Sequence, residues 1–212
     1  WKTSDLITSM DCVIAWRPWW INKLWKPRTE GLHLDQNPFN KPNLETVQGM
    51  IPLLDVTSRT GGLEVVPCSH LPEAKDAYKL RYPNIKFAGD WCVLTPGCPL
   101  GKKRMLVLAN AGDLILWDSR TIHGGKVGTG KIMKTSSSCT PSLARLSVTV
   151  CMTPKSRASE KVLKRRREGF QRGECFNRTP HEAGTSSGTL RCKIRKDYKP
   201  TELTKNQLSL LG

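Results

Sequence analysis

The pattern of hydrophobic and polar positions consists of short apolar runs separated by glycine and proline, which is typical of β-strands joined by turns. Helical periodicity is scarce before residue 155, and no internal repeat is evident. The stretch 67–104 is rich in proline and is expected to be a long loop. Such short strands predict a sandwich or a barrel. The clearest predicted strands are Val47–Asp55, Leu63–Val66, Met105–Ala109, Asp113–Trp117 and Arg145–Thr153.

Tryptophan is concentrated at the start of the chain, where residues 1–30 hold five of the seven tryptophans. One interpretation is hydrophobic packing with hydrogen-bonded indole N–H groups, and the other is an aromatic wall beside a substrate pocket. The sequence leaves both open.

Charge divides the chain into two parts. Its 212 residues are 38% hydrophobic and 25% charged, which fits one domain or a domain with an extension. No apolar run reaches the roughly 18 residues of a membrane-spanning helix. The net charge is +16, and residues 155–212 hold 15 basic and 6 acidic side chains, more than half of that excess. We therefore expect a core over 1–154 and a basic helical and loop extension over 155–212, packed on the core.

The basic run 161–167 lies on a predicted helix of this extension. It is interpreted either as a solvated helix face or as a contact for phosphate or nucleic acid.

Eight cysteines are scattered along the chain, and none forms a Cys-x-x-Cys motif. This spacing argues against a zinc ribbon and favours reduced cysteines over a disulfide framework, so a cytoplasmic location is favoured. The chain begins at Trp1, and we expect an N-terminal piece to be missing, which leaves a removed targeting segment open.

The first candidate metal ligands along the chain lie in the tripeptide His33-Leu34-Asp35. In an extended chain, side chains two residues apart point to the same face, so His33 and Asp35 can converge on one metal ion while Leu34 turns away. Downstream, the predicted strand Asp113–Trp117 leads to His123, which is followed by two glycines that allow backbone or a ligand to come close. Two imidazoles and one carboxylate are a donor set that suits Fe(II) with open coordination positions.

The strand Arg145–Thr153 alternates between a polar and an apolar face, and Arg145 and Ser147 share the polar one. A buried guanidinium needs an anionic partner, and its planar fork matches a carboxylate. Arg145 and Ser147 are therefore a candidate binding site for the distal carboxylate of a 2-oxo diacid. A structural salt bridge is the other interpretation.

These motifs, with Asp55–His70 between them, resemble the phytanoyl-CoA dioxygenase-like branch of the Fe(II)/2-oxoglutarate-dependent dioxygenases over about residues 30–154. The resemblance implies a mainly β fold, a double-stranded β-helix (jelly roll, cupin-like) with flanking helices. It implies that 2-oxoglutarate is decarboxylated to succinate while O2 oxidises a substrate, by hydroxylation because Asp35 keeps the carboxylate that halogenating relatives lack.

Carried over residue by residue, the resemblance makes His33, Asp35 and His123 the catalytic iron ligands. It makes Arg145 the 2-oxoglutarate anchor with Ser147 assisting, and Gln48 a weaker candidate for the co-substrate pocket. His70 is expected to be structural, because the two other histidines already supply the imidazole ligands.

Three departures from the family pattern stand out. The gap from His123 to Arg145 is long, which an inserted loop or a misassigned arginine would explain. Cys68 stands where the family's turn commonly has glycine, which questions the geometry of that turn. The missing start of the chain is expected to carry further binding residues.

The main functional hypothesis is a hydroxylase acting on an unidentified small molecule, which the positive charge allows to be anionic. The alternatives are a catalytically inactive metal-binding jelly roll and a basic nucleic-acid-binding module. Nucleic acid is not expected as a partner, because the second arginine of related demethylases would fall at Cys151. The oligomeric state stays open.

Overall fold

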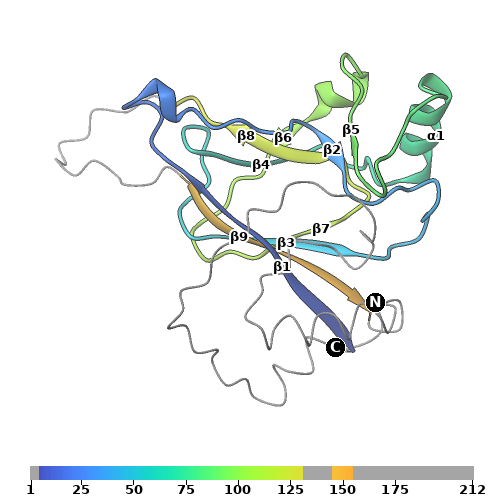
Figure 1. Cartoon of the computed structure of the whole chain (residues 1–212), viewed down its shortest axis with the longest axis horizontal. Coiled ribbons are helices and arrows are strands. Elements are labelled where there is room, and N and C mark those ends of the chain that lie inside the picture. Colours follow the sequence, from blue (N-terminus) through green and yellow to red (C-terminus); the bar gives the residue numbers. More distant parts are fainter. Residues whose placement is uncertain (1–4, 131–144, 155–212) are drawn as a thin grey trace.

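Two antiparallel β-sheets, stacked as layers, form the body of the protein (Figure 1). The computed structural model describes residues 5–130 and 145–154. The four-stranded sheet has the order β1 (Leu6–Trp16), β9 (Arg145–Pro154), β3 (Val47–Pro52), β7 (Ile115–Asp118). The five-stranded sheet has the order β5 (Cys92–Val93), β2 (His33–Leu34), β8 (His123–Val127), β4 (Gly61–Val65), β6 (Met105–Leu106).

Successive strands alternate between the two sheets from β2 to β4 and again from β6 to β9. This winding is that of a double-stranded β-helix, so the predicted fold class is confirmed. All five strands expected from the apolar runs are present, with ends shifted by a few residues. The sequence interpretation missed β2, β5 and β8, of which two are only two residues long. It also missed β1, whose pairing with β9 is interrupted by an irregularity between Met10 and Cys12.

One helix, α1 (Pro72–Arg81), lies inside the stretch that was expected to be a loop, so that expectation was wrong here. Pro72 stands in the first turn of α1, where its missing N–H costs no hydrogen bond. The helix shows little apolar periodicity because only Lys75 and Tyr78 are buried on it. Short 3-10 turns occur at Lys23–Trp25 and Pro99–Lys103.

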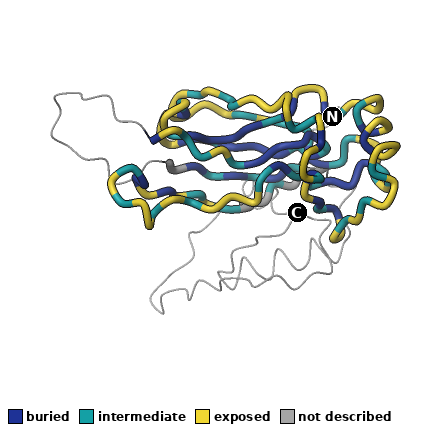
Figure 2. Tube along the Cα trace, turned by 90° about the horizontal axis from the view of Figure 1, so that it is seen from above, coloured by how far each residue is buried: buried dark blue, intermediate teal, exposed yellow. Residues whose placement is uncertain are grey.

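The main hydrophobic core lies between α1 and the five-stranded sheet, because Tyr78 of α1 packs together with Leu34 of β2. Figure 2 shows buried stretches running through the middle of the strands and exposed loops at the ends. The buried members of this core are Leu32, Leu34, Val66, Tyr78, Leu94, Cys98 and Ile122.

A second, smaller cluster contains Trp16 and Trp19, whose rings meet edge to face at 6.0 Å. Both side chains are buried, which supports the packing interpretation for these two tryptophans.

The alternation predicted for β9 is present, and its polar face is the buried one. Ser147, Thr149 and Cys151 are buried, whereas Val148 and Val150 are partly exposed. The polar face of β9 therefore looks into the space between the sheets. Arg145 opens this strand opposite Trp16 and has the same parity as Ser147.

Within residues 5–130 and 145–154, all cysteines are free thiols: Cys12, Cys68, Cys92, Cys98 and Cys151. No helix in these ranges is long and apolar enough to cross a membrane. The predicted extension 155–212 with its basic run 161–167, and most of the proposed insertion before Arg145, lie outside the described residues.

Candidate metal centre

Two neighbouring strands of the five-stranded sheet bring the predicted ligands together. His33 of β2 is the pairing partner of His123 of β8, so two residues 90 positions apart in sequence lie side by side. Asp35 follows β2 directly, with Leu34 between it and His33. Leu34 is fully buried in the core beneath α1, so the alternation expected for this tripeptide is observed.

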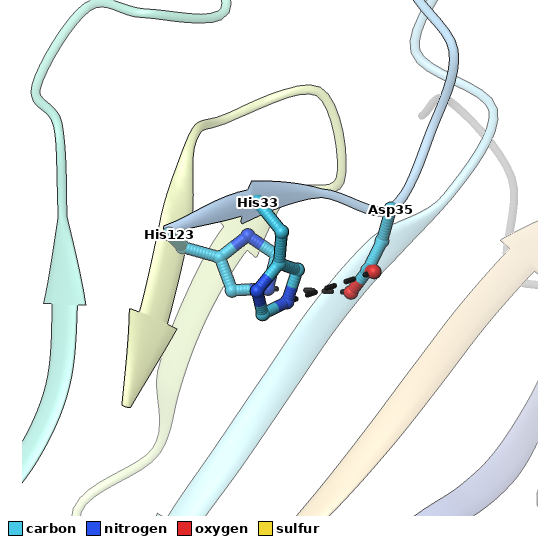
Figure 3. A group of neighbouring side chains, drawn as sticks. All are labelled: His33, Asp35 and His123. Atoms are coloured by element: carbon cyan, nitrogen blue, oxygen red, sulfur yellow. Dashed lines mark ion pairs between the residues drawn. The ribbon is translucent and has the colours of Figure 1, made fainter. Parts of the chain in front are cut away.

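Figure 3 shows both histidine rings converging on the carboxylate of Asp35. The Nε2 atom of His123 lies 3.3 Å from Asp35 Oδ2, and the Nε2 atom of His33 lies 3.7 Å from Asp35 Oδ1. Each residue offers one ligand atom, and these atoms lie within 4.8 Å of one another. Such a cluster leaves room for one ion between three donors.

Backbone carbonyl groups orient both imidazoles. The Nδ1 atom of His33 lies 2.9 Å from the carbonyl oxygen of Gly31, and that of His123 lies 2.9 Å from the carbonyl oxygen of Thr121. Because a carbonyl oxygen only accepts, each Nδ1 carries the proton and donates. The Nε2 atoms are therefore the ones that face Asp35, as in a metal-binding histidine whose other nitrogen is held by the protein.

The charge states of the cluster suit a cation. Burial lowers the pKa of His33, and the nearby His123 lowers it further, against the opposing charge of Asp35. Burial raises the pKa of Asp35, but its hydrogen bond with His123, the two imidazoles and the hydrogen bond from Gln48 outweigh burial and leave the pKa below its usual range. Neutral imidazole and ionised carboxylate are the forms that bind metal.

Gln48 of β3 reaches the cluster from the opposite sheet. Its Nε2 donates a hydrogen bond of 2.7 Å to Asp35 Oδ2. Trp117, the pairing partner of Gln48 on β7, has its ring 5.3 Å from that of His123, and the Trp91 ring lies 6.3 Å from that of His33. The sequence interpretation did not assign these two tryptophans to the site. The only signal for Trp117 was the strand parity that it shares with Ile115, which is partly buried.

The backbone before and after His123 is held by buried contacts. Ser69 Oγ accepts a hydrogen bond of 2.8 Å from the N–H of Ile122, and both residues are buried. Gly124 allows close backbone approach, because a Cβ at this position would lie 2.3 Å from the carbonyl oxygen of Gly31. The turn before Ser69 keeps a left-handed conformation at Cys68, with φ of 58°, so the cysteine found where glycine is common does not abolish that turn.

Ser147 lies on the same sheet as Gln48, paired with Pro52 four pairs further along β3 than the Gln48–Cys151 pair. It is fully buried, and its Oγ has no hydrogen-bond partner among the described residues. The side chain of Arg145 lies outside what the structure describes. His70 is not among the residues of the metal cluster within the described ranges.

The residues present fit Fe(II). Two imidazole nitrogens and one carboxylate oxygen, all on one side of the ion, are the facial donor set of non-haem Fe(II) oxygenases. Without an ion, the Asp35 carboxylate has protonated Nε2 atoms of the histidines as its positively charged neighbours. A metal cation between the three groups would supply that positive charge instead.

The family model of phytanoyl-CoA dioxygenase (PhyH) matches residues 3–134 of the chain. No curated protein matches the chain.

Solved structures with a similar fold include an alpha ketoglutarate dependent non-heme epimerase, SnoN from nogalamycin biosynthesis. It is 19% identical, with a TM-score of 0.42, over 69% of this chain and 49% of that one. AviO1 from Streptomyces viridochromogenes is 15% identical, with a TM-score of 0.42, over 71% of this chain and 52% of that one. EctD from S. alaskensis is 17% identical, with a TM-score of 0.37, over 64% of this chain and 42% of that one.

The chain thus spans about half the length of these structures or less. Because the family model matches more than half of its residues, the chain belongs to the phytanoyl-CoA dioxygenase family.

Proposed function

We propose that this protein is an Fe(II)- and 2-oxoglutarate-dependent oxygenase that hydroxylates a small organic molecule. The observation that carries the proposal is the convergence of His33, Asp35 and His123, with both Nε2 atoms facing the same carboxylate. Family membership and the Fe3+ and alpha ketoglutarate that are named for one SnoN structure support the same cofactors here.

The three side chains would hold Fe(II) on one face and leave its other positions open for co-substrate and O2. Bound iron would supply the oxidative decarboxylation of 2-oxoglutarate to succinate and the activation of O2. Asp35 would occupy the position that a halide needs in halogenating relatives, which is why hydroxylation is proposed. The tryptophans beside the two histidine rings would limit the access of water to the ion.

The first residues of β9 offer a place for the co-substrate. Ser147 Oγ is buried without a partner among the described residues, and an unsatisfied buried hydroxyl is costly unless a ligand supplies its hydrogen bond. Arg145, two residues earlier on the same face of the strand pattern, would pair with the distal carboxylate of 2-oxoglutarate. A planar guanidinium and a neighbouring hydroxyl together suit a carboxylate group.

Anaerobic spectroscopy tests the proposal without knowledge of the substrate. Full-length protein with Fe(II) and 2-oxoglutarate is expected to show a visible charge-transfer band that neither ligand produces alone. His123→Ala should abolish the band. His70→Ala, a histidine replacement outside the cluster, should keep it.

Aerobic succinate formation over a metabolite panel that includes anionic compounds then tests turnover. A band together with substrate-dependent succinate supports the oxygenase. Metal binding without any 2-oxoglutarate band would instead favour a metal-binding jelly roll without turnover. No metal binding at all would refute the assignment of the ligands.

A further inference from the structure

The hydrogen bond between Gln48 and Asp35 connects the two sheets at the metal centre. Gln48 lies in β3 of the four-stranded sheet, whereas Asp35 follows β2 of the five-stranded sheet. Its side chain is 5% exposed, and its Nε2 donates to Asp35 Oδ2 over 2.7 Å. The donor end of this side chain is therefore committed to a carboxylate that the two histidines also approach.

Asp35 lies just outside the paired residues of a short strand, and its carboxylate is shared between two histidines. β2 contains only two residues, and Asp35 stands just beyond its end. Its two oxygens are chemically equivalent and face different histidines, Oδ1 toward His33 and Oδ2 toward His123. A donor that always occupies a lone pair of Oδ2 makes the oxygens different and limits rotation of the group.

Gln48 itself is held firmly at this place. Its strand pairs on both sides, with Trp117 of β7 and Cys151 of β9 as the direct partners of Gln48. A rigid strand is a better support for a ligand than the end of a two-residue strand, because orientation at a metal depends on the groups that hold the ligands.

We infer that Gln48 is a positioning residue for Asp35, holding one carboxylate oxygen so that the group meets the metal in a single orientation. This inference rests on the proposed metal site. A residue of the co-substrate pocket would contact 2-oxoglutarate, whereas Gln48 contacts the metal ligand Asp35 through its Nε2 atom. The two roles predict losses in different binding constants.

Metal affinity and co-substrate affinity, measured separately, distinguish them. Gln48→Met keeps the length of the side chain and removes both polar atoms. Thr149→Val is the matched control: Thr149 is also a buried polar residue on the inner face of this sheet, but it bonds to the backbone of Cys12. Anaerobic titration with Co(II), followed by its d–d absorption, gives the metal dissociation constant, and 2-oxoglutarate is titrated afterwards at saturating metal.

Gln48→Met is expected to raise the metal dissociation constant by about 10–100-fold, as is usual for loss of a group that orients a ligand, and to change the intensity of the d–d bands. The affinity for 2-oxoglutarate at saturating metal should change little. Thr149→Val should leave both constants near those of the wild-type protein. Circular dichroism verifies that each variant is folded.

Unchanged metal affinity in Gln48→Met would overturn the inference, and a weaker 2-oxoglutarate affinity in that variant would place Gln48 in the co-substrate pocket. Absence of Co(II) binding by the wild-type protein would instead refute the proposed function and the inference with it. If Gln48→Met does not fold, Gln48→Asn provides the same test, because its amide is one methylene too short to reach Asp35. Weaker metal binding supports the inference there too, and unchanged metal binding overturns it.

Discussion

Lys75 is a buried cation whose protonation should control the pH dependence of stability. It lies on α1, is 5% exposed, and its Nζ donates a hydrogen bond of 2.6 Å to the carbonyl oxygen of Arg120. Burial lowers the pKa of Lys75 from 10.5 to about 7, with the charge of Arg120 lowering it and that of Asp118 opposing the change. The folded protein therefore loses this proton at a much lower pH than the unfolded chain does.

The free energy of unfolding depends on pH because the folded and unfolded states bind the Lys75 proton with different affinities. Between about pH 7 and pH 10.5 the unfolded state holds the proton and the folded state does not, so stability rises with pH across this window. Below pH 7 both states are protonated and the full cost of burying the charge is present. The difference between a pKa of 10.5 and one of about 7 corresponds to about 5 kcal/mol of stability between the two ends of the window.

Replacement of Lys75 by methionine should remove this dependence. We expect Lys75→Met to be more stable than the wild-type protein at pH 6. The backbone carbonyl oxygen of Arg120 loses a hydrogen bond in this variant, but that loss costs only about 1 kcal/mol. The advantage should shrink as the pH rises toward 10. Urea unfolding of both proteins at several pH values gives the free energies of unfolding to compare.

Lys79→Met is the matched control, because Lys79 is an exposed lysine on the same helix. Its effect on the free energy of unfolding should be the same at pH 6 and pH 9. A free-energy difference between wild type and Lys75→Met that does not change with pH would refute the reasoning, since it would mean that Lys75 has no lowered pKa.

Three further substitutions test the surroundings of the metal centre. Cys68→Gly should stabilise the protein by about 0.5–1 kcal/mol in urea unfolding, because Cys68 has a φ of 58° and an exposed side chain; a destabilised variant would contradict this. Gly124→Ala should cost about 1–3 kcal/mol and weaken Co(II) binding, because the new Cβ would lie 2.3 Å from the Gly31 carbonyl oxygen; a normal thermal melt would show that the strands adjust. Ser69→Ala should cost about 1–3 kcal/mol in urea unfolding, because the buried N–H of Ile122 loses its acceptor, and an unchanged unfolding midpoint would rule out this contribution.

The sequence allowed part of the fold to be predicted, because some strands, such as β3 and β9, have continuous apolar or alternating patterns. Long pairing alone was not enough, since β1 pairs with β9 from Leu6 to Trp16 and was missed. The helix α1 could not be found in this way, since its surface is polar and most of it faces solvent. Strands of two residues carry no period at all, and β2 is recognisable only because it pairs with β5 and β8.

Assuming an extended chain was enough to place His33 and Asp35 on one side, and the alternation of β9 placed Ser147 with Thr149 on one side, because an extended chain has a period of two. A period does not say which side faces inward. Only the stacking of the two sheets decided that the polar face of β9 is buried, contrary to the usual preference for apolar interiors.

The pairing of His33 with His123, and the contact of Gln48 with Asp35 across the sheets, likewise exist only in the folded structure. Both join residues from different strands, whose distances depend on the closure of the whole jelly roll. Residue types and local spacing determined which side chains were available for chemistry, and tertiary structure determined which of them meet.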